Sequence, residues 1–520
     1  MTAAVPGAIA SRSPALEARG IDKRFGPVHA NRNISLVVRR GTIHGIIGEN
    51  GAGKSTLMGI LYGFHQPDSG EIRVDGQVQR FRSPKDALKA GIGMVHQHFM
   101  LVEPFTVVEN VVLGAEDSFR IEDSLVRARA ELKKLGRDYH LEVDVDATIA
   151  DLTVGQRQRV EILKALYRGA QILILDEPTG VLTPQEADHL FRILRALKAE
   201  GKTVILITHK LREVLDVTDT VTVVRRGEVV AEVATATTTK ESLAELMVGR
   251  KVLLRVDKTP ARPGEVVLDV ADLRVRDSAG VERVKGVSFQ VRRGEIVGIA
   301  GVAGNGQSEL LEALAGIRPV SGGTLRWKGV DITNDAGVRS AKGMRRLGLG
   351  HVPEDRQRMG LVAEFAASES AILGYHDDAP YNRNIILDRR IVSRECGRQM
   401  VEYDVRPPNV NLPTSAFSGG NQQKIIVARE VDHNPDVLLV GQPTRGVDIG
   451  AIEFIHKRLV ALRDAGKGIL LVSVELDEIL SLSDRILVMF DGTLVGELSP
   501  EQANERTVGL MMAGIRSEAA

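Results

Sequence analysis

The chain has 520 residues, of which 43% are hydrophobic, 26% charged and 4% aromatic, a composition typical of globular proteins with more than one core. The 68 basic residues balance 68 acidic ones, which argues against a basic nucleic-acid-binding protein and against an acidic disordered tail. A single cysteine, Cys396, excludes an intramolecular disulfide framework, and no apolar run approaches the ~18 residues of a membrane-spanning helix. The sequence therefore predicts a soluble protein that serves any membrane process through a partner.

The first motif in chain order is GENGAGKS, which begins at Gly48 and follows an apolar run at 42–47. The pattern G-x4-G-K-S between a predicted strand and a predicted helix is typical of a phosphate-binding loop. Its glycines let backbone N–H groups surround phosphates, and the following helix adds a favourable dipole. Lys54 can reach the β- and γ-phosphates, and the Ser55 hydroxyl can bind Mg²⁺. The predicted phosphate site comprises Gly48, Glu49, Asn50, Gly51, Ala52, Gly53, Lys54, Ser55 and Thr56.

A stretch rich in charge and helix formers follows at 110–150, and we expect it to be a helical insertion. Further apolar runs at 171–175 and 203–207 alternate with helical patterns, which favours a parallel α/β sheet.

Two carboxylates, Asp176 and Glu177, directly follow the strand-like run at 171–175. Ligands bind at the carboxyl edge of a parallel sheet. We expect Asp176 to hold Mg²⁺, commonly through water, and Glu177 to orient and polarise an attacking water. A solvated acidic turn would explain the pair equally well by itself, and the phosphate loop is what favours the catalytic interpretation.

The second half of the sequence repeats the first. SLVVRRGTIHGIIGENGAGKST, from Ser35, matches SFQVRRGEIVGIAGVAGNGQSE, from Ser288, at a spacing of 253 residues. LTVGQRQRVEILKAL, from Leu152, matches FSGGNQQKIIVAREV, from Phe417, at a spacing of 265 residues. Two homologous domains with an insertion in the second explain both spacings.

The predicted domains span 15–250 and 265–513. The stretch between them, 251–264, contains prolines and a glycine and has mixed charge, as expected of a linker.

The sequence contains the phosphate loop, then the LTVGQ element at 152–156 and then the LDEP strand. This is the order found in ATP-binding cassette (ABC) ATPases, which the chain resembles twice over nearly its whole length. The resemblance implies an α/β fold with two tandem P-loop ABC ATPase domains, each a parallel-sheet core with a helical subdomain. It implies ATP and Mg²⁺ as cofactors. It also implies roles for three further residues: Gln97 contacts the γ-phosphate, Mg²⁺ and the membrane partner, His209 contacts the γ-phosphate, and Phe25 stacks on adenine.

The second copy lacks the residues that carry this chemistry. In the second copy, Gln307 stands in place of Lys54 and Glu354 in place of Gln97. Gly441, Gln442 and Val474 stand in place of Asp176, Glu177 and His209, in that order. No aromatic residue lies where adenine would stack. These losses together predict that only the first copy hydrolyses ATP.

The second copy nevertheless retains a signature element, FSGGN, and an aspartate in PTRGVD. Because domains of this family sandwich ATP head to tail, the resemblance implies one complete site, which unites the first copy's residues with Ser418, Gly419, Gly420, Asn421 and Asp448. The first copy's own signature, with Val154 in place of a glycine, predicts an impaired second site.

The fused pair resembles the ATPase subunits of bacterial importers for nucleosides and for ribose- or galactose-type sugars, and the stretches at 94–114 and 442–459 look closer to the nucleoside branch. The resemblance implies two transmembrane permease subunits, an extracytoplasmic solute-binding protein as an indirect partner, no nucleic acid, and a peripheral location at the cytoplasmic face of the plasma membrane. Helical segments near 98–115 and 355–375 are predicted to contact the permeases. Sugars remain an alternative substrate, and a soluble translation or repair ATPase is less favoured.

Overall fold

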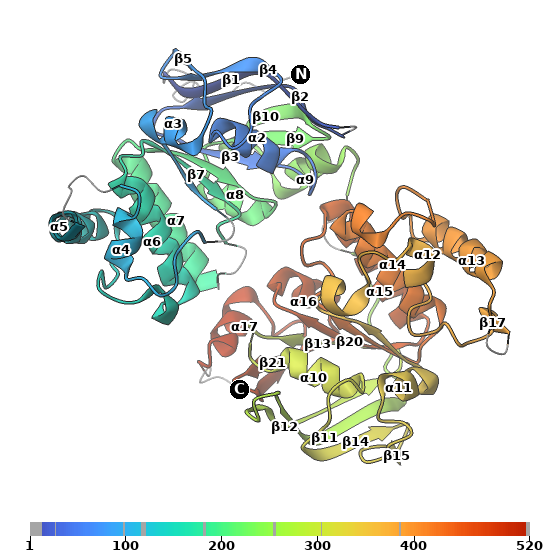
Figure 1. Cartoon of the computed structure of the whole chain (residues 1–520). Helices are drawn as coiled ribbons and strands as arrows, with labels where there is room; N and C mark the ends of the chain where they lie inside the picture. Colours follow the sequence, from blue (N-terminus) through green and yellow to red (C-terminus); the bar gives the residue numbers. More distant parts are fainter. Residues whose placement is uncertain are drawn as a thin grey trace. The chain divides into compact units, whose positions relative to one another are not determined.

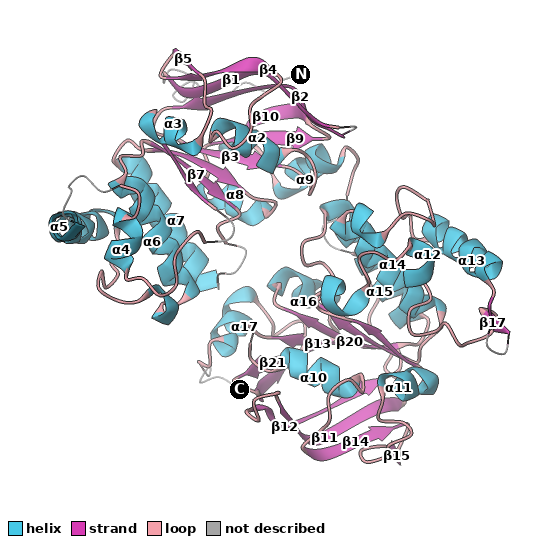
Figure 2. Cartoon of the chain, in the orientation of Figure 1, coloured by secondary structure: helices cyan, strands magenta, loops and turns pink. Residues whose placement is uncertain are grey.

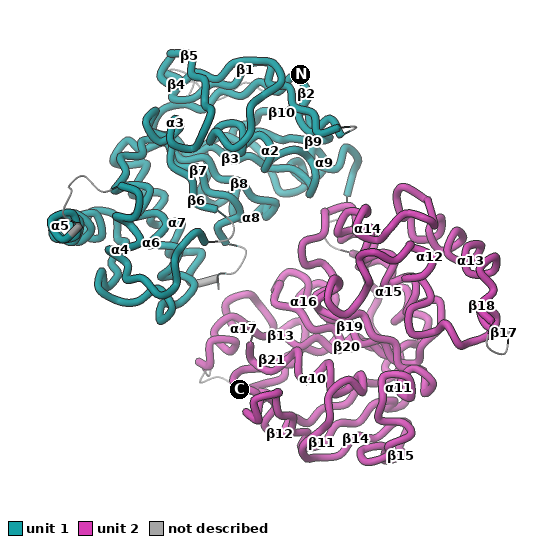
Figure 3. Tube along the Cα trace, viewed as in Figure 1, with its two compact units in different colours: residues 1–252 teal, residues 253–520 magenta. Residues whose placement is uncertain are grey.

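The computed structural model describes residues 13–26, 28–96, 99–115, 121–179, 182, 184–252, 256–302, 304–383 and 386–515. The chain forms two compact units, residues 1–252 and 253–520 (Figure 3).

The first unit alternates strands and helices (Figure 1). Its strands are β1 (Pro14–Phe25), β2 (Val28–Arg39), β3 (Ile43–Ile47), β4 (Ser69–Val74), β5 (Gln77–Gln79), β6 (Ile92–Val95), β7 (Ile172–Asp176), β8 (Thr203–Ile207), β9 (Thr220–Arg225) and β10 (Glu228–Ala234). Its helices are α2 (Lys54–Leu61), α3 (Pro84–Lys89), α4 (Val107–Val112), α5 (Ile121–Tyr139), α6 (Val154–Tyr167), α7 (Pro184–Ala199), α8 (Leu211–Val217) and α9 (Lys240–Val248).

The central sheet of this unit has the strand order β10-β9-β3-β8-β7-β6, in which every neighbouring pair is parallel except β10 with β9. All residues of β3 and β8 are buried, as expected of strands covered on both faces. The predicted apolar runs therefore correspond to the middle of the sheet, with β3 beside β8 and β8 beside β7. Their carboxyl ends meet at one edge, where the functional residues follow.

A second, antiparallel sheet of order β2-β1-β4-β5 belongs to the same unit and was absent from the sequence prediction. Its long strands alternate buried and partly exposed residues, because one face packs on a core and the other meets solvent. A hydrophobic core that includes Leu16, Ile46, Leu57 and Ile205 joins the two sheets and α2.

The predicted helical insertion at 110–150 is only partly helical. α4 begins earlier, at Val107, and α5 ends at Tyr139, after which residues 140–148 form no helix. In the segment 98–115, the described residues are helical only in α4. Aliphatic side chains of α4, α6 and α7 form a second core on the central sheet.

The second unit repeats this plan (Figure 2). Its strands are β11 (Val266–Arg276), β12 (Glu282–Arg292), β13 (Ile296–Ala300), β14 (Gly322–Trp327), β15 (Val330–Asp331), β16 (Leu349–Val352), β17 (Asn382–Arg383), β18 (Ile386–Leu387), β19 (Val437–Gly441), β20 (Gly468–Ser473), β21 (Arg485–Phe490) and β22 (Thr493–Leu498). Its helices are α10 (Gln307–Leu314), α11 (Ala341–Leu347), α12 (Ala367–Ser370), α13 (Arg389–Glu402), α14 (Gly419–Asp432), α15 (Ile449–Asp464), α16 (Leu476–Leu482) and α17 (Glu505–Met512).

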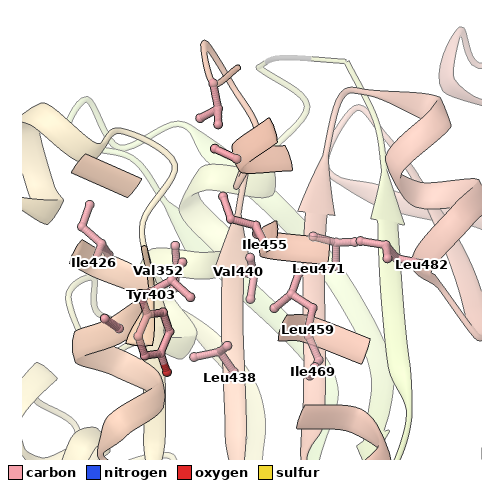
Figure 4. Close-up of a cluster of buried hydrophobic side chains, with 14 of the residues drawn as sticks. Val352, Tyr403, Ile426, Leu438, Val440, Ile455, Leu459, Ile469, Leu471 and Leu482 are labelled. Atoms are coloured by element: carbon pink, nitrogen blue, oxygen red, sulfur yellow. The ribbon is translucent and has the colours of Figure 1, made fainter. Parts of the chain in front are cut away.

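The strand orders β16-β19-β20-β13-β21-β22 and β12-β11-β14-β15 reproduce those of the first unit. The core between the central sheet and its helices contains Leu438, Val440 and Leu471 from the strands and Ile455 and Leu459 from α15 (Figure 4). Two mixed α/β units with parallel sheet cores confirm the predicted fold class. The segment 355–375, which we predicted to be helical, contains only a π-helical turn and the four-residue α12.

One partly buried contact is repeated in both units. In the first, Asp219 accepts hydrogen bonds from the backbone N–H of Ile43 at 2.9 Å and from Lys198 Nζ at 2.6 Å. In the second, Asp484 accepts from the N–H of Ile296, also at 2.9 Å. The carboxylate thus satisfies the first N–H of the central strand in each sheet.

Among the described residues, no helix combines the length and the apolar character that a membrane crossing requires.

Candidate functional site

The predicted phosphate loop lies between β3 and α2. Gly53, which precedes α2, has a φ of 101°, and a side chain there would collide with the backbone oxygen of Ala30. Only glycine satisfies both constraints. The loop therefore turns sharply at the N-terminus of α2, where helix N–H groups favour phosphate.

Lys54 is buried against this loop, and its Nζ donates to the backbone oxygens of Gly48 at 2.7 Å and Glu49 at 3.0 Å. Burial lowers the pKa of the Lys54 ammonium, whereas the negative charges of Glu177 and Asp176 act in the opposite direction. The Lys54 ammonium is thus held at the phosphate loop, where it would pair with the negative charge of a bound phosphate.

The remaining loop residues differ in exposure. Asn50, Gly51 and Ser55 are exposed, Glu49 and Thr56 are half-buried, and Ala52 is buried. The hydroxyl of Ser55 therefore stands in the first turn of α2 where a ligand can reach it.

Asp176 ends β7 and Glu177 follows it, as predicted. Glu177 has a φ of 46°, an uncommon value for a side chain other than glycine, and its N–H donates to Ile207 O of β8 at 2.9 Å. Burial, followed by the charge of Glu177, raises the pKa of Asp176. A hydrogen bond with His209 lowers the pKa of Glu177. The pKa values of the two neighbouring carboxyl groups are therefore shifted in opposite directions, upward for Asp176 and downward for Glu177.

His209 follows β8, and its Nδ1 lies 2.8 Å from Oε1 of Glu177. Both side chains are partly exposed. The two side chains therefore form a direct, solvent-accessible pair at the carboxyl edge of the sheet.

A further residue, Glu213 of α8, was missed by the sequence analysis. Its buried carboxylate accepts from the hydroxyl of Thr179, two residues after Glu177, and from that of Thr208, next to His209, at 2.9 Å. Burial raises the pKa of Glu213. It therefore links the two loops that carry the general base and the histidine. The only signal in the sequence was an acidic residue on the apolar face of a predicted helix.

Phe25 and Gln97 are the two remaining predictions for this unit. Phe25 ends β1, and its ring is 44% exposed, with an edge-to-face contact to His65 at 5.3 Å between centroids. An exposed ring is available for stacking. Gln97 lies outside the described residues.

The equivalent loop of the second unit keeps the shape and changes the charge. Gly306 has a φ of 98°, close to that of Gly53, but the buried residue that follows is Gln307, whose Nε2 donates to Val302 O at 3.2 Å. The fixed positive charge is absent. The hydroxyl of Ser308 instead donates to the carboxylate of Glu354.

The strand end also differs. Gln442 has a φ of 46°, the same as Glu177, but its Oε1 accepts from the backbone N–H of Val474 at 3.3 Å, where the first unit has an imidazole. Gly441 has no side chain in place of Asp176. At these positions the second unit therefore has neither the two carboxylates nor the imidazole of the first.

The signature residues of the second unit begin α14. Ser418 precedes the helix and accepts from Asn421 Nδ2 at 2.9 Å, while Gly419 and Gly420 form the first helical residues. Asp448 starts α15 and accepts from Ala451 N at 2.8 Å. Both helices therefore have capped N-termini.

In the first unit, the corresponding helix α6 has Thr153 at its start and Gln156 in a reciprocal hydrogen-bonding arrangement with it. Val154, in the position of Gly419, is 40% exposed. The substitution therefore changes the surface at the helix start without disturbing the fold.

Comparison with known proteins gives three related findings. A family model described as ABC transporter matches residues 31–180 and 284–445. The nucleoside import ATP-binding protein NupA of Lactococcus lactis is 49% identical over 95% of this chain and 97% of its own, and the guanosine import ATP-binding protein NupO of Bacillus subtilis is 47% identical over 96% and 97%. The glucose import ATP-binding protein TsgD13 of Haloferax volcanii is 46% identical over 97% and 96%.

The two matched segments fall one in each unit, and each contains the phosphate loop and the strand that leads to the carboxylate positions. This agreement confirms the family recognised from the loop, signature and strand motifs. The chain belongs to the ABC transporter family, as an ATP-binding and ATP-hydrolysing protein with two cassettes in one polypeptide.

Proposed function

We propose that this protein energises nucleoside import through partner permeases and that its first unit alone hydrolyses ATP. The observation that carries the proposal is the hydrogen bond between His209 and Glu177 beside the loop of Lys54, a combination that the second unit lacks. The names of the relatives that import nucleosides and guanosine support the substrate class.

In this proposal the loop N–H groups and Lys54 hold the phosphates of ATP. Glu177, kept ionised by its contact with His209, takes a proton from the attacking water. Phe25 stacks on the adenine, and Glu213 keeps the loops of Glu177 and His209 in register.

Ser55, Asp176 and Gln97 would hold Mg²⁺. The donors fit this ion, because a hydroxyl, a carboxylate and an amide oxygen are hard ligands, and the charge of Asp176 acts on the neighbouring Lys54. Bound there, Mg²⁺ would neutralise charge on the phosphates.

We further propose that hydrolysis depends on the second unit's signature, namely Ser418, Gly419, Gly420 and Asn421, and on Asp448. These residues lie at the N-termini of α14 and α15, and helix N-termini bind phosphate in proteins generally.

The proposed partners are two transmembrane permeases and, indirectly, an extracytoplasmic solute-binding protein, with this chain at the cytoplasmic face of the plasma membrane. Met100 and Leu113 flank α4 with exposed apolar side chains, which suit a contact with another protein. The segment 355–375 is the equivalent candidate in the second unit.

The test is uptake of labelled nucleosides and of labelled pentoses and hexoses in cells that carry the wild type, Glu177→Gln or the matched control Gln442→Ala. We expect Glu177→Gln to abolish nucleoside uptake alone, with the control unaffected. Selective loss of sugar uptake would move the substrate to sugars, the alternative that the glucose-importing relative favours. Unchanged uptake of all solutes would contradict the importer role.

A further inference from the structure

The segment 445–448, which leads into α15, packs against the start of the signature helix α14. A side chain built on Gly420 would place its Cβ 2.6 Å from Oδ2 of Asp448, and one built on Gly419 would place its Cβ 2.9 Å from the backbone oxygen of Gly446. The two signature glycines therefore permit a close approach that any larger residue would prevent.

A guanidinium from a third element lies in this contact. Arg356 begins the π-helical turn Arg356–Gly360, which follows β16. Its Nη1 donates to the backbone oxygen of Arg445 at 2.6 Å, and its Nη2 lies 3.5 Å from that of Gly446. A Cβ on Gly419 would lie 2.5 Å from the same Nη2. The planar guanidinium therefore holds the backbone of the segment 445–448 and lines the start of the signature helix.

The turn that presents Arg356 is itself fixed at both ends. Asp355 precedes it, and its carboxylate accepts from the backbone N–H groups of the second and third residues of the turn, each at 3.0 Å. At the other end, the backbone oxygen of Gly360 accepts from Nη1 of Arg429, a buried residue of α14, at 2.8 Å. The side chain of Arg356 thus starts from a defined position.

The first unit is built differently at this place. Phe105 and Phe365 are equivalent, because the backbone oxygen of each accepts from the first residue of the 3-10 turn that precedes the signature. The chain between β16 and Phe365 is three residues longer than that between β6 and Phe105, and the turn of Arg356 lies in this longer segment. Val154 stands in the position of Gly419, where the guanidinium leaves no room for a side chain. The glycine and the arginine therefore belong together.

Arg356 is poorly suited to a role in stability alone. It is half-buried, and among the described residues its Nε has no hydrogen-bond partner. A buried donor without a partner destabilises the fold, which offsets what the contacts with the two backbone oxygens contribute. We therefore expect its loss to change the geometry of the segment 445–448 more than the stability of the chain.

We propose that Arg356 is a positioning residue for ATP hydrolysis, which holds the segment of Asp448 against the signature of the second unit. The inference rests on the proposed function, in which hydrolysis by Glu177 depends on Asp448 and on that signature. Arg356 acts through these groups and not on the phosphates. A displacement of about 1 Å of groups that face a reacting centre lowers the rate by about a hundredfold.

The experiment is steady-state ATP hydrolysis by the purified full chain carrying Arg356→Ala, Arg356→Lys or the matched control Arg358→Ala. Arg358 has the same charge and lies in the same turn, but it is exposed. We expect both substitutions of Arg356 to lower kcat by about tenfold to a hundredfold, with KM for ATP within about twofold of wild type, because the first unit's loop is intact. Lysine does not rescue activity, since one ammonium cannot replace a planar fork. The control should keep both constants within about twofold.

Amide hydrogen exchange gives a readout that does not depend on activity. Arg356→Ala should speed exchange in the segment 445–448, and Arg358→Ala should leave it unchanged. An unchanged KM and melting temperature exclude misfolding as the cause of a lower kcat. Should Arg356→Ala fail to fold, Arg356→Lys, which keeps the charge, provides the same comparison.

Four outcomes would overturn the inference: kcat near wild type in Arg356→Ala, equal losses in Arg356→Ala and Arg358→Ala, full activity in Arg356→Lys, or a lower kcat without faster exchange. Failure of the proposed function has a different signature. Wild-type hydrolysis by Asp448→Asn would show that hydrolysis does not depend on Asp448. A lower kcat in Asp448→Asn together with normal activity in Arg356→Ala would refute only the role of Arg356.

Discussion

The two units share their strand order and the aspartate contact at the start of the central strand, and they differ where side chains face the phosphate loop. The carboxylates of Asp219 and Asp484 accept the same backbone hydrogen bond at the same distance. By contrast, the ammonium of Lys54 is replaced by the amide of Gln307. The comparison shows that residues that build the sheet and residues that perform the chemistry are separable sets within one fold.

The backbone conformation of the residues after β7 and β19 supports the same conclusion. Glu177 and Gln442 have the same positive φ of 46°, although Glu177 pairs with the imidazole of His209 and Gln442 with the backbone N–H of Val474. Such a conformation costs about 1–3 kcal/mol for a residue other than glycine. Because the second unit retains this conformation with a glutamine in place of the glutamate, the turn is a requirement of the shared fold.

The largest expected effect comes from installing the second unit's residues in the first. Lys54→Gln and Glu177→Gln should each lower kcat for ATP hydrolysis by about 10²–10³-fold or more, because each removes a strong contact to the transition state. Steady-state hydrolysis of ATP by the purified chain measures this. Gln442→Ala, the same position in the second unit, is the control and should stay within about twofold of wild type. Multiple-turnover hydrolysis near the wild-type rate in Glu177→Gln would refute the asymmetry.

The next prediction separates a role of Glu213 in positioning two loops of the site from a role in stabilising the fold. Glu213→Ala should lower kcat by about tenfold to a hundredfold with little change in KM, because the loops of Glu177 and His209 lose the carboxylate to which both are hydrogen-bonded. Glu478, the corresponding buried residue of α16, bonds instead to Nε2 of His456 at 2.9 Å. Glu478→Ala should therefore reduce stability without a comparable loss of kcat. Equal losses of kcat in both variants would show that Glu213 acts only through stability.

A pH profile tests the contact between His209 and Glu177. The hydrogen bond with His209 is the largest cause that lowers the pKa of Glu177, and burial raises it. His209→Ala removes that cause and leaves only the charges of Lys54 and Lys210 against burial, so the pKa rises. The carboxylate form is then lost at a higher pH as the solution is acidified. We expect the acidic limb of the kcat profile of the variant to move to higher pH than in the wild type. An unchanged limb, or one displaced to lower pH, would contradict the role of Glu177 as the base held ionised by His209.

The smallest effect tests the features that the units share. Asp219→Asn and Asp484→Asn each weaken a charge-assisted hydrogen bond to a central strand and should each cost about 1–3 kcal/mol. Differential scanning calorimetry should show a fall of several °C in the Tm of the altered unit. A marked difference between the two variants would show that the duplicated contact has diverged in energetic importance.

The sequence predicted the residues that immediately follow a buried strand. Asp176, Glu177 and His209 come after apolar runs of five residues, and because those runs are neighbouring parallel strands, their ends meet at one edge. The fold class followed from the same runs and from the repeat.

The sequence did not predict contacts that depend on the path of a loop or on the face of a helix. Glu213 reaches both loops because α8 packs beside them, and Glu354 reaches Ser308 because the loop after β16 passes over Gly441. The antiparallel sheet was missed because its strands are long and irregularly alternating, with several shifts of register. The predicted helices in 98–115 and 355–375 were too long, because the described residues there form only short helical segments joined by turns and irregular backbone.

The space above Gly441 also bears on how such a chain can change over generations. Restoring an aspartate there would drive its Cβ to 2.5 Å from Glu354 Cγ and 2.8 Å from Leu311 Cδ1, well inside any normal contact distance. Replacing Gly441 alone by aspartate is therefore disfavoured by the side chain of Glu354, which fills the space. Recovery of a second hydrolytic centre would need Glu354 to change first, followed by Gln307, Gln442 and Val474.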